Sequence, residues 1–243
     1  MKREVAILAA TGAVGQRFVE LLEGHPWFDI SVLAASERSA GKKYREAANW
    51  KLESDMPKEI GEMTVVNTDL KSIEESGNID FIFSALPGDV AGPVEEEFAT
   101  YYPIISKAAA HRHDVDVPLL IPEVNPEQLE LIPVQRKNRG WNGFISTDPN
   151  CSTIQLAITL KPLMTFGLKK ILVTTMQALS GAGYPGVASL DIVDNVVPFI
   201  SKEEEKLESE TKKILGTFDG SRVRPADIIL SASCNRVNVK DGH

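Results

Sequence analysis

Cys151 and its neighbours offer the clearest chemistry in this sequence. The thiol follows Asp-Pro-Asn at 148–150 and opens an apolar stretch, 151–165, that predicts a helix. The start of a helix lowers a thiol pKa and raises the thiolate content, which suits a nucleophile. The same residue type also suits a small buried side chain, the commonest role of a free cysteine. Cys234 lies in a predicted strand, and we expect it to be such a packing residue.

A second candidate is a phosphate-binding loop. The segment 9–15, Ala-Ala-Thr-Gly-Ala-Val-Gly, follows a short apolar run and opens a predicted helix. It is a variant of the dinucleotide fingerprint in which Ala9 replaces the first glycine. Gly12 would let the backbone approach a pyrophosphate, which the helix amides would then bind. The residues expected to hold a dinucleotide here are Thr11, Gly12, Ala13 and Val14.

The loop after the next predicted strand indicates which dinucleotide this is. That strand ends in Ser36, Glu37, Arg38 and Ser39. An acid at this place would bind the ribose 2′-hydroxyl of NAD, whereas an arginine with hydroxyls would accept the 2′-phosphate of NADP. Both residue types are present, and Ser36, Arg38 and Ser39 together favour NADP.

Strands that alternate with helices are expected to position these residues. In the first half, short apolar runs predict strands at 5–9, 30–35, 63–66, 79–86, 104–105, 119–121 and 144–145, with helices at 14–22 and 90–101. Runs without polar alternation are typical of strands buried on both faces of a parallel sheet. The fold class is therefore α/β, with a doubly wound parallel sheet in the N-terminal half.

The second half has a different character. Long strands are predicted at 168–179 and 228–239, and helices at 188–197 and 203–215. We place a domain boundary near residue 150, between 1–149 and 150–243. The last strand runs into Asp-Gly, a strong hairpin signal, but no returning strand follows. We therefore interpret the chain as lacking a C-terminal part, and expect the 243-residue polypeptide alone to be inactive or poorly folded.

The composition excludes several classes of protein. The chain has 34 acidic and 26 basic residues and a net charge of -8, which argues against nucleic acid or an anionic membrane as the partner. No apolar run reaches the roughly 18 residues of a membrane span, so the cytoplasm is the expected location. Two cysteines form no disulfide framework, and the four histidines lack H-x-x-x-H spacing, so no metal is expected.

Several longer motifs resemble one family. The segments Asn-Cys-Ser-Thr at 150–153, Gln-Ala-Leu-Ser-Gly-Ala-Gly-Tyr-Pro-Gly at 177–186 and 231–243 are similar to the archaeal and fungal branch of the aspartate-β-semialdehyde dehydrogenases, as are 35–44 and 117–126. The resemblance covers essentially the whole chain in family order. It implies a Rossmann-type NADP-binding domain over 1–149 and part of an α+β catalytic and dimerisation domain over 150–243. It also implies a homodimer or homotetramer.

The resemblance implies an activity and roles for single residues. The family reduces aspartyl phosphate with NADPH to aspartate semialdehyde, reversibly and through a cysteine thioester, in the biosynthesis of lysine, threonine, methionine and diaminopimelate. Cys151 would be the nucleophile and His243 the general acid and base. The other implied roles are orientation of the intermediate by Gln177 and Asn150, carboxylate binding by Arg236, amino-group binding by Glu203, phosphate binding by Lys206 and Arg112, and cofactor binding by Ser180, Gly181 and Gly183.

Two alternatives remain open at this point. An acyl-CoA reductase similar to malonyl-CoA reductase would keep Cys151 and the NADP loop, although the set Glu203, Lys206 and Arg236 favours the aspartyl substrate. A non-catalytic NADP-binding fragment is the other alternative, because the chain stops at His243 and Ala9 departs from the family pattern. Lys107 departs as well, since asparagine is usual there, and it adds a positive charge near the expected cofactor.

Overall fold

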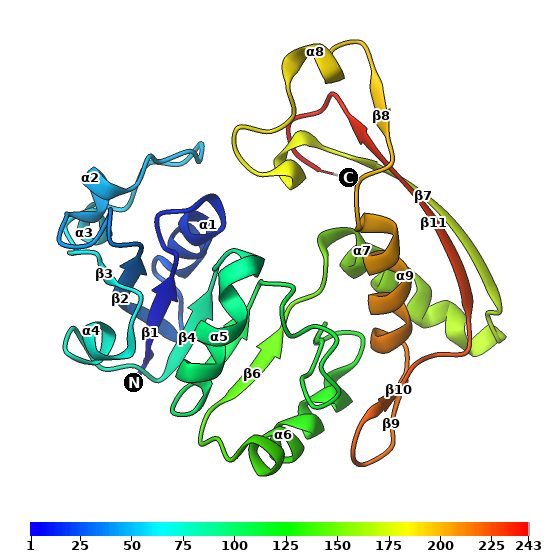
Figure 1. Ribbon diagram of the computed structural model, residues 1–243, viewed down its shortest axis with the longest axis horizontal. Coiled ribbons are helices and arrows are strands. Elements are labelled where there is room, and N and C mark those ends of the chain that lie inside the picture. Colours follow the sequence, from blue (N-terminus) through cyan, green and yellow to red (C-terminus); the bar gives the residue numbers. More distant parts are fainter. Residues whose placement is uncertain (243) are drawn as a thin grey trace. The chain divides into compact units, whose positions relative to one another are not determined.

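A computed structural model describes residues 1–242, and His243 lies outside the described residues. The chain divides into two compact units (Figure 1). The first unit contains 1–118 and 131–148, and the second contains 119–130 and the residues from 149 onward. Each unit is described by itself below.

The first unit is built on a six-stranded parallel sheet with the strand order β3-β2-β1-β4-β5-β6. This is the order of a doubly wound dinucleotide-binding sheet, and it confirms the predicted fold class. The chain reverses its winding between β1 and β4, and ligands of such sheets bind at the carboxyl ends of the strands there. The strands are β1 Arg3–Leu8, β2 Phe28–Ala35, β3 Val66–Asn67, β4 Phe81–Ser84, β5 Pro103–Ser106 and β6 Phe144–Thr147.

Strand β1 shows why the apolar runs lack polar alternation. Ala6 and Leu8 pack into one core with Phe98, whereas Ile7 packs into the core on the other face of the sheet with Val19. All five side chains are fully buried, so both faces of β1 require apolar residues. The helices of this unit are α1 Ala13–Leu22, α2 Tyr44–Ala47, α3 Lys58–Gly61, α4 Leu70–Glu74, α5 Gly88–Ala99 and α6 Leu131–Arg139.

The second unit combines helices with a small mixed sheet. Its three-stranded sheet has the order β7-β11-β8, in which the central strand β11 runs parallel to β7 and antiparallel to β8. Helix α9 contacts both α7 and β11 (Figure 1). The elements are η1 Pro126–Glu130, α7 Cys151–Leu160, η2 Lys161–Phe166, β7 Lys170–Gln177, η3 Leu179–Ala182, α8 Ser189–Ile192, β8 Val196–Pro198, α9 Glu203–Ile214, β9 Thr217–Phe218, β10 Val223–Arg224 and β11 Ile229–Val237.

Two predicted strands are largely wrong. Residues 119–121 form no strand beyond a single bridge residue, Leu119, because side-chain groups of Gln128 and Asn125 bind much of their backbone. The Leu119 amide donates to Gln128 Oε1 at 3.2 Å, and the Ile121 amide donates to Asn125 Oδ1 at 2.8 Å. Of the predicted strand 63–66, only Val66 lies in a strand, since the preceding residues bind the loop at 42–44.

The predicted helix 188–197 is also wrong over most of its length. Only Ser189–Ile192 is helical, and the chain then extends into β8, Val196–Pro198. The β-branched Val196 and Val197 fit a strand well, and Pro198 cannot donate a hydrogen bond inside a helix. An apolar run of this length does not distinguish a helix from a strand by its spacing alone.

Candidate active site

Cys151 is the first residue of α7, and its side chain is exposed. Asn150 caps this helix, since its Oδ1 atom accepts from the amides of Ser152 at 3.0 Å and Thr153 at 3.3 Å. Asparagine is among the preferred capping residues because its side chain satisfies amides that have no partner within the helix. The cap therefore fixes the nucleophile candidate at the positive end of the helix dipole.

Helix α9 holds the capping residue from two sides. The Asn150 side chain donates from Nδ2 to Glu203 Oε1 at 2.8 Å, which also settles which end of the amide faces the helix. The Asn150 backbone amide donates to Glu210 Oε2 at 2.7 Å. Both glutamates are buried, at 6% and 0% exposure. Sequence reasoning missed Glu210, although its spacing of seven residues from Glu203 puts both on one helix face.

The structure also brings Lys206 to this group. Its Nζ atom lies 3.5 Å from Glu203 Oε2, one turn further along α9. Glu203 thus has a polar neighbour at each carboxylate oxygen, Asn150 at one and Lys206 at the other. Three of the predicted site residues therefore gather beside the start of α7.

Gln177 and Arg236 lie opposite each other on paired strands, β7 and β11. Both side chains are almost fully buried. The Arg236 guanidinium donates from Nη1 to the carbonyl of Ala178 at 2.6 Å, and Gln177 Nε2 donates to Thr175 Oγ1 at 3.2 Å. The register of this parallel pair accordingly places a fixed cation and a carboxamide at one end of the sheet.

The predicted cofactor residues at 180–183 follow β7 in the second unit. A β-carbon on Gly181 would lie 2.9 Å from Arg236 Nη1, so glycine leaves room for the guanidinium. Gly183 has φ +74°, a conformation that glycine adopts readily. The Ser180 amide donates to the carbonyl of Lys240 at 3.0 Å. The predicted role of His243 lies outside the described residues and stays a prediction.

The candidate phosphate-binding loop lies in the first unit, between β1 and α1. Ala9 has φ +56°, a left-handed conformation that costs an alanine of order 1–2 kcal/mol and that glycine adopts freely. A β-carbon on Gly15 would lie 2.3 Å from the Ala9 carbonyl oxygen, so only glycine fits there. Gly12 is the N-cap of α1 and brings no capping side chain. Thr11 is half-buried, and the next three residues are exposed.

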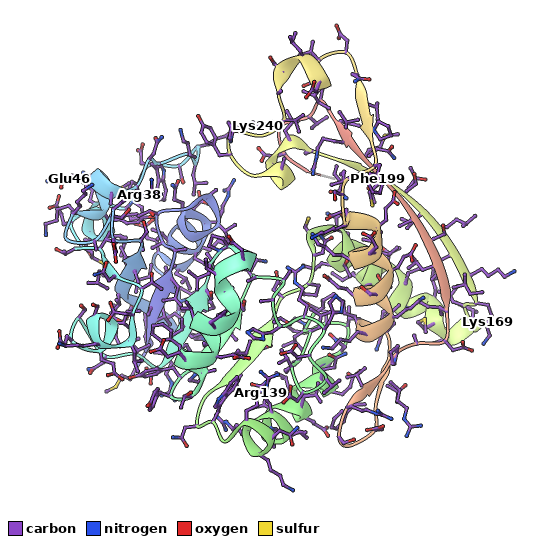
Figure 2. All side chains as sticks on the ribbon, in the orientation of Figure 1. Arg38, Glu46, Arg139, Lys169, Phe199 and Lys240 are labelled. Carbon is purple, nitrogen blue, oxygen red and sulfur yellow. The ribbon has the colours of Figure 1, made fainter. Side chains whose placement is uncertain are left out.

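The candidate 2′-phosphate residues form a turn at the end of β2. The Ser39 amide donates to the carbonyl of Ser36 at 2.8 Å, and Ser36 and Arg38 are exposed. Figure 2 shows Arg38 in the part of the first unit that also carries Glu46. The turn therefore presents hydroxyls and one guanidinium at the carboxyl end of a strand beside β1.

Arg112 and Lys107 are joined by a hydrogen bond within the first unit. The Arg112 side chain is buried, and its Nη2 atom donates to the carbonyl of Lys107 at 3.0 Å. The Lys107 ammonium forms an ion pair with Asp148, which offsets the extra charge expected from this departure. Within residues 1–242 no group of three His, Cys, Asp or Glu side chains could hold a metal, and no helix is long and apolar enough to cross a membrane.

Comparisons with known proteins give a separate match for each half of the chain. Residues 4–132 match the family model described as semialdehyde dehydrogenase, NAD binding domain, and residues 160–243 match the semialdehyde dehydrogenase dimerisation domain. An aspartate-semialdehyde dehydrogenase of Methanothermobacter thermautotrophicus is 55% identical over 240 residues, which cover 98% of this chain and 68% of that protein. One of Schizosaccharomyces pombe is 49% identical over 247 residues, which cover 99% and 68%.

Solved structures extend the comparison. The aspartate semialdehyde dehydrogenase of Candida albicans, crystallised with NADP, aligns with a TM-score of 0.88 and 42% identity over 99% of this chain and 69% of that one. The form II enzyme of Vibrio cholerae complexed with ASA aligns with a TM-score of 0.70 and 29% identity. By sequence, family models and fold, this chain belongs to the aspartate-semialdehyde dehydrogenase family.

Proposed function

We propose that the chain carries out the NADP-dependent, reversible conversion of L-aspartyl-4-phosphate to L-aspartate-4-semialdehyde, as the named activity of its relatives suggests. One observation carries the proposal most strongly. The Cys151 thiol stands at a capped helix start whose capping residue is held by Glu203, with Lys206 beside it. A nucleophile, an acceptor for an ammonium group and a cation for phosphate thus occur together in one unit.

The residues of the second unit suit the individual steps. The Cys151 thiolate attacks the aldehyde carbon, and the positive end of α7 stabilises the oxyanion that develops. Loss of hydride leaves a thioester on the sulfur, which phosphate then attacks to give the acyl phosphate. His243 would move the proton in each direction, because an imidazole nitrogen can accept a proton and later donate it.

Substrate recognition follows from the charges around these steps. Arg236 suits the substrate carboxylate, because a planar guanidinium binds a carboxylate through two parallel hydrogen bonds. Glu203 suits the ammonium group, and Lys206 and Arg112 suit the phosphate. This set argues against the acyl-CoA reductase alternative, since a malonyl thioester has neither an amino group nor a phosphate to be displaced.

The first unit fits NADP as the cofactor. Gly12 at the N-cap of α1 leaves the first-turn amides to a pyrophosphate, and Gly15 lets the helix start lie close to β1. Ser36, Arg38 and Ser39 suit the 2′-phosphate. Bound NADP would accept the hydride released in the semialdehyde-oxidising direction.

We also propose that the chain assembles with a second copy of itself, in the cytoplasm. The match to a dimerisation domain supports the assembly. The sheet of the second unit presents large apolar side chains on one face, with Leu172 88%, Met176 62% and Ile229 63% exposed. On β7 and β11 these side chains alternate with less exposed ones, as expected of a sheet face that a partner covers.

The proposal is tested by NADPH formation from aspartate semialdehyde, NADP and phosphate. The grouping of Cys151 with Glu203 and Lys206 leads us to expect turnover in place of the inactivity expected from the sequence. This turnover should require phosphate and disappear in Cys151→Ala, while the control Cys234→Ala should retain it because Cys234 is fully buried. Turnover with malonyl-CoA and NADPH, without activity on the semialdehyde, would support the acyl-CoA reductase instead. NADP binding without any turnover would support the non-catalytic alternative and contradict the proposal.

A further inference from the structure

Glu95 is a fully buried carboxyl group to which the proposed function gives no role. It lies on α5 in the first unit, and its Oε1 atom accepts two hydrogen bonds. Ser84 Oγ donates to it at 2.6 Å, and Ser106 Oγ donates at 2.7 Å. These serines are the last residues of β4 and β5. One oxygen atom therefore joins the carboxyl ends of two neighbouring parallel strands.

The two serines also bind the backbone of the loop after β5. The Ser84 carbonyl accepts from the Lys107 amide at 3.0 Å, and Ser106 Oγ accepts from the Ala108 amide at 3.1 Å. The Lys107 carbonyl in turn accepts from Arg112 Nη2 at 3.0 Å. A continuous series of hydrogen bonds thus runs from the Glu95 carboxyl to the guanidinium proposed to bind phosphate.

The loop after β5 lies near the edge of the sheet at which a dinucleotide would bind. Strand β4 pairs with β1 and β5 pairs with β4, so their carboxyl ends lie at the edge of a doubly wound sheet where dinucleotides bind. A binding site needs its surrounding loops held within a fraction of an ångström, and buried contacts beneath the loops provide that. The Glu95 carboxyl is fully buried and contacts the last residues of β4 and β5, from which the loops after these strands begin.

A carboxyl group at this buried position costs more stability than an apolar side chain would. Its Oε2 atom is buried without a hydrogen-bond partner among residues 1–242, and His111 Nε2 lies 4.0 Å away. Burial raises the pKa of the Glu95 carboxyl, against the opposing effects of the two serine hydroxyls and His111. A leucine would fill a similar volume without this penalty, so the hydrogen bonds to the serines are the feature that leucine could not replace.

We propose that Glu95 is a positioning residue that, by accepting from Ser84 and Ser106 on one oxygen, fixes the 106–112 loop for NADP and for phosphate binding by Arg112. The inference rests on the proposed function for its ligands. The part of the inference that concerns the order of the 106–112 loop does not depend on any ligand.

The test compares Glu95→Leu with Glu95→Gln, whose carbonyl oxygen can still accept both hydroxyls. Two controls accompany them: Glu97→Leu, an exposed position on the same helix, and Ile145→Val, a core change in β6 that lowers stability without touching the serines. Amide hydrogen exchange at Lys107 and Ala108 reports the loop directly. Titration with NADP and the KM for phosphate report its consequences.

We expect Glu95→Leu to speed exchange at both amides and to raise the NADP dissociation constant and the phosphate KM by about tenfold, the equivalent of one lost hydrogen bond. Glu95→Gln should stay within about threefold of the parent chain. Ser84→Ala and Ser106→Ala should each reproduce part of the leucine effect.

Equal shifts in Ile145→Val and Glu95→Leu would overturn the inference, because general destabilisation would then explain both. Unchanged exchange at Lys107 and Ala108 in Glu95→Leu would overturn it as well. A parent chain that binds no NADP would contradict the proposed function and the ligand part of the inference, whereas the exchange rates would still decide whether Glu95 orders the loop.

Discussion

Replacing Asn150 is expected to lower the unfolding free energy. The structure separates this loss into two contributions. Asn150→Ala removes the capping oxygen from the amides of Ser152 and Thr153, which costs about 1 kcal/mol of unfolding free energy. It also removes the donor to the buried Glu203 Oε1, which leaves that oxygen unsatisfied at a cost of about 1–3 kcal/mol. The expected total is about 2–4 kcal/mol.

Asn150→Ser separates the two contributions. A serine hydroxyl can cap the helix but cannot reach Glu203 as the longer amide does, so the serine variant should be about 1 kcal/mol more stable than the alanine variant. Gln155→Ala provides the control, because Gln155 is an exposed residue on the same helix. Such a surface change should stay within about 0.5 kcal/mol of the parent.

Urea unfolding of the four proteins measures these differences, with equal slopes showing that only stability has changed. Turnover measured alongside should fall further in Asn150→Ala than in Asn150→Ser, since the cap positions Cys151. An Asn150→Ala variant no less stable than Gln155→Ala would refute the reasoning. Equal stability of the serine and alanine variants would refute the part assigned to the cap.

Further predictions concern four other positions. Gly15→Ala should lower the unfolding free energy by about 1–3 kcal/mol in calorimetry, because its β-carbon would meet the Ala9 carbonyl at 2.3 Å. Gly12→Ala makes only a 3.4 Å contact, so it should lose NADP affinity with less loss of stability; equal losses of stability would contradict this. Burial raises the Glu95 pKa above 4.5, so the folded chain holds this proton better than the unfolded chain. The parent therefore loses stability as pH rises above 4.5, and Glu95→Gln should gain relative to it in urea titrations; a pH-independent difference would contradict the assignment. Burial also raises the Cys234 pKa, so iodoacetamide should label this thiol only in urea, and labelling of the native chain would show that it is accessible.

Some features of the site follow directly from local sequence. The apolar stretch at 151–165 predicts a helix that opens at Cys151, and the structure begins α7 at that residue. Gly15 follows a buried strand at the spacing of the dinucleotide fingerprint, and the structure shows that no other residue fits. These predictions succeed because each depends on contacts within a few residues along the chain.

Other features depend on contacts between distant segments. Glu210 reads as one more charge on a solvated helix, yet it is fully buried against the backbone of Asn150, 60 residues away. The segment 119–130 lies between β5 and β6 of the first sheet in sequence but belongs to the second unit, where Gln128 donates to the carbonyl of Lys213 at 2.9 Å. In both contacts the partner lies far away along the chain, so the local hydrophobic pattern could not predict them.

Helix α6, Leu131–Arg139, escaped prediction for a different reason. Pro133 usually marks a break, but it falls in the first turn, where a proline is tolerated because its missing amide needs no partner. The other apolar residues of the helix lie among its first four residues and the last five residues are polar, so it shows no apolar periodicity. Its buried Gln135 instead bonds the carbonyls of Asp116 and Ile145, each at 3.0 Å.

The central claim is that Cys151 carries the acyl group between the aldehyde and phosphate. Its most direct test is mass spectrometry of the chain mixed with aspartate semialdehyde and NADP while phosphate is withheld. The account predicts about one NADPH per chain, an acyl adduct on the peptide that contains Cys151, and loss of the adduct when phosphate is added. NADPH formation without an adduct, an adduct on another residue, or neither product would contradict it.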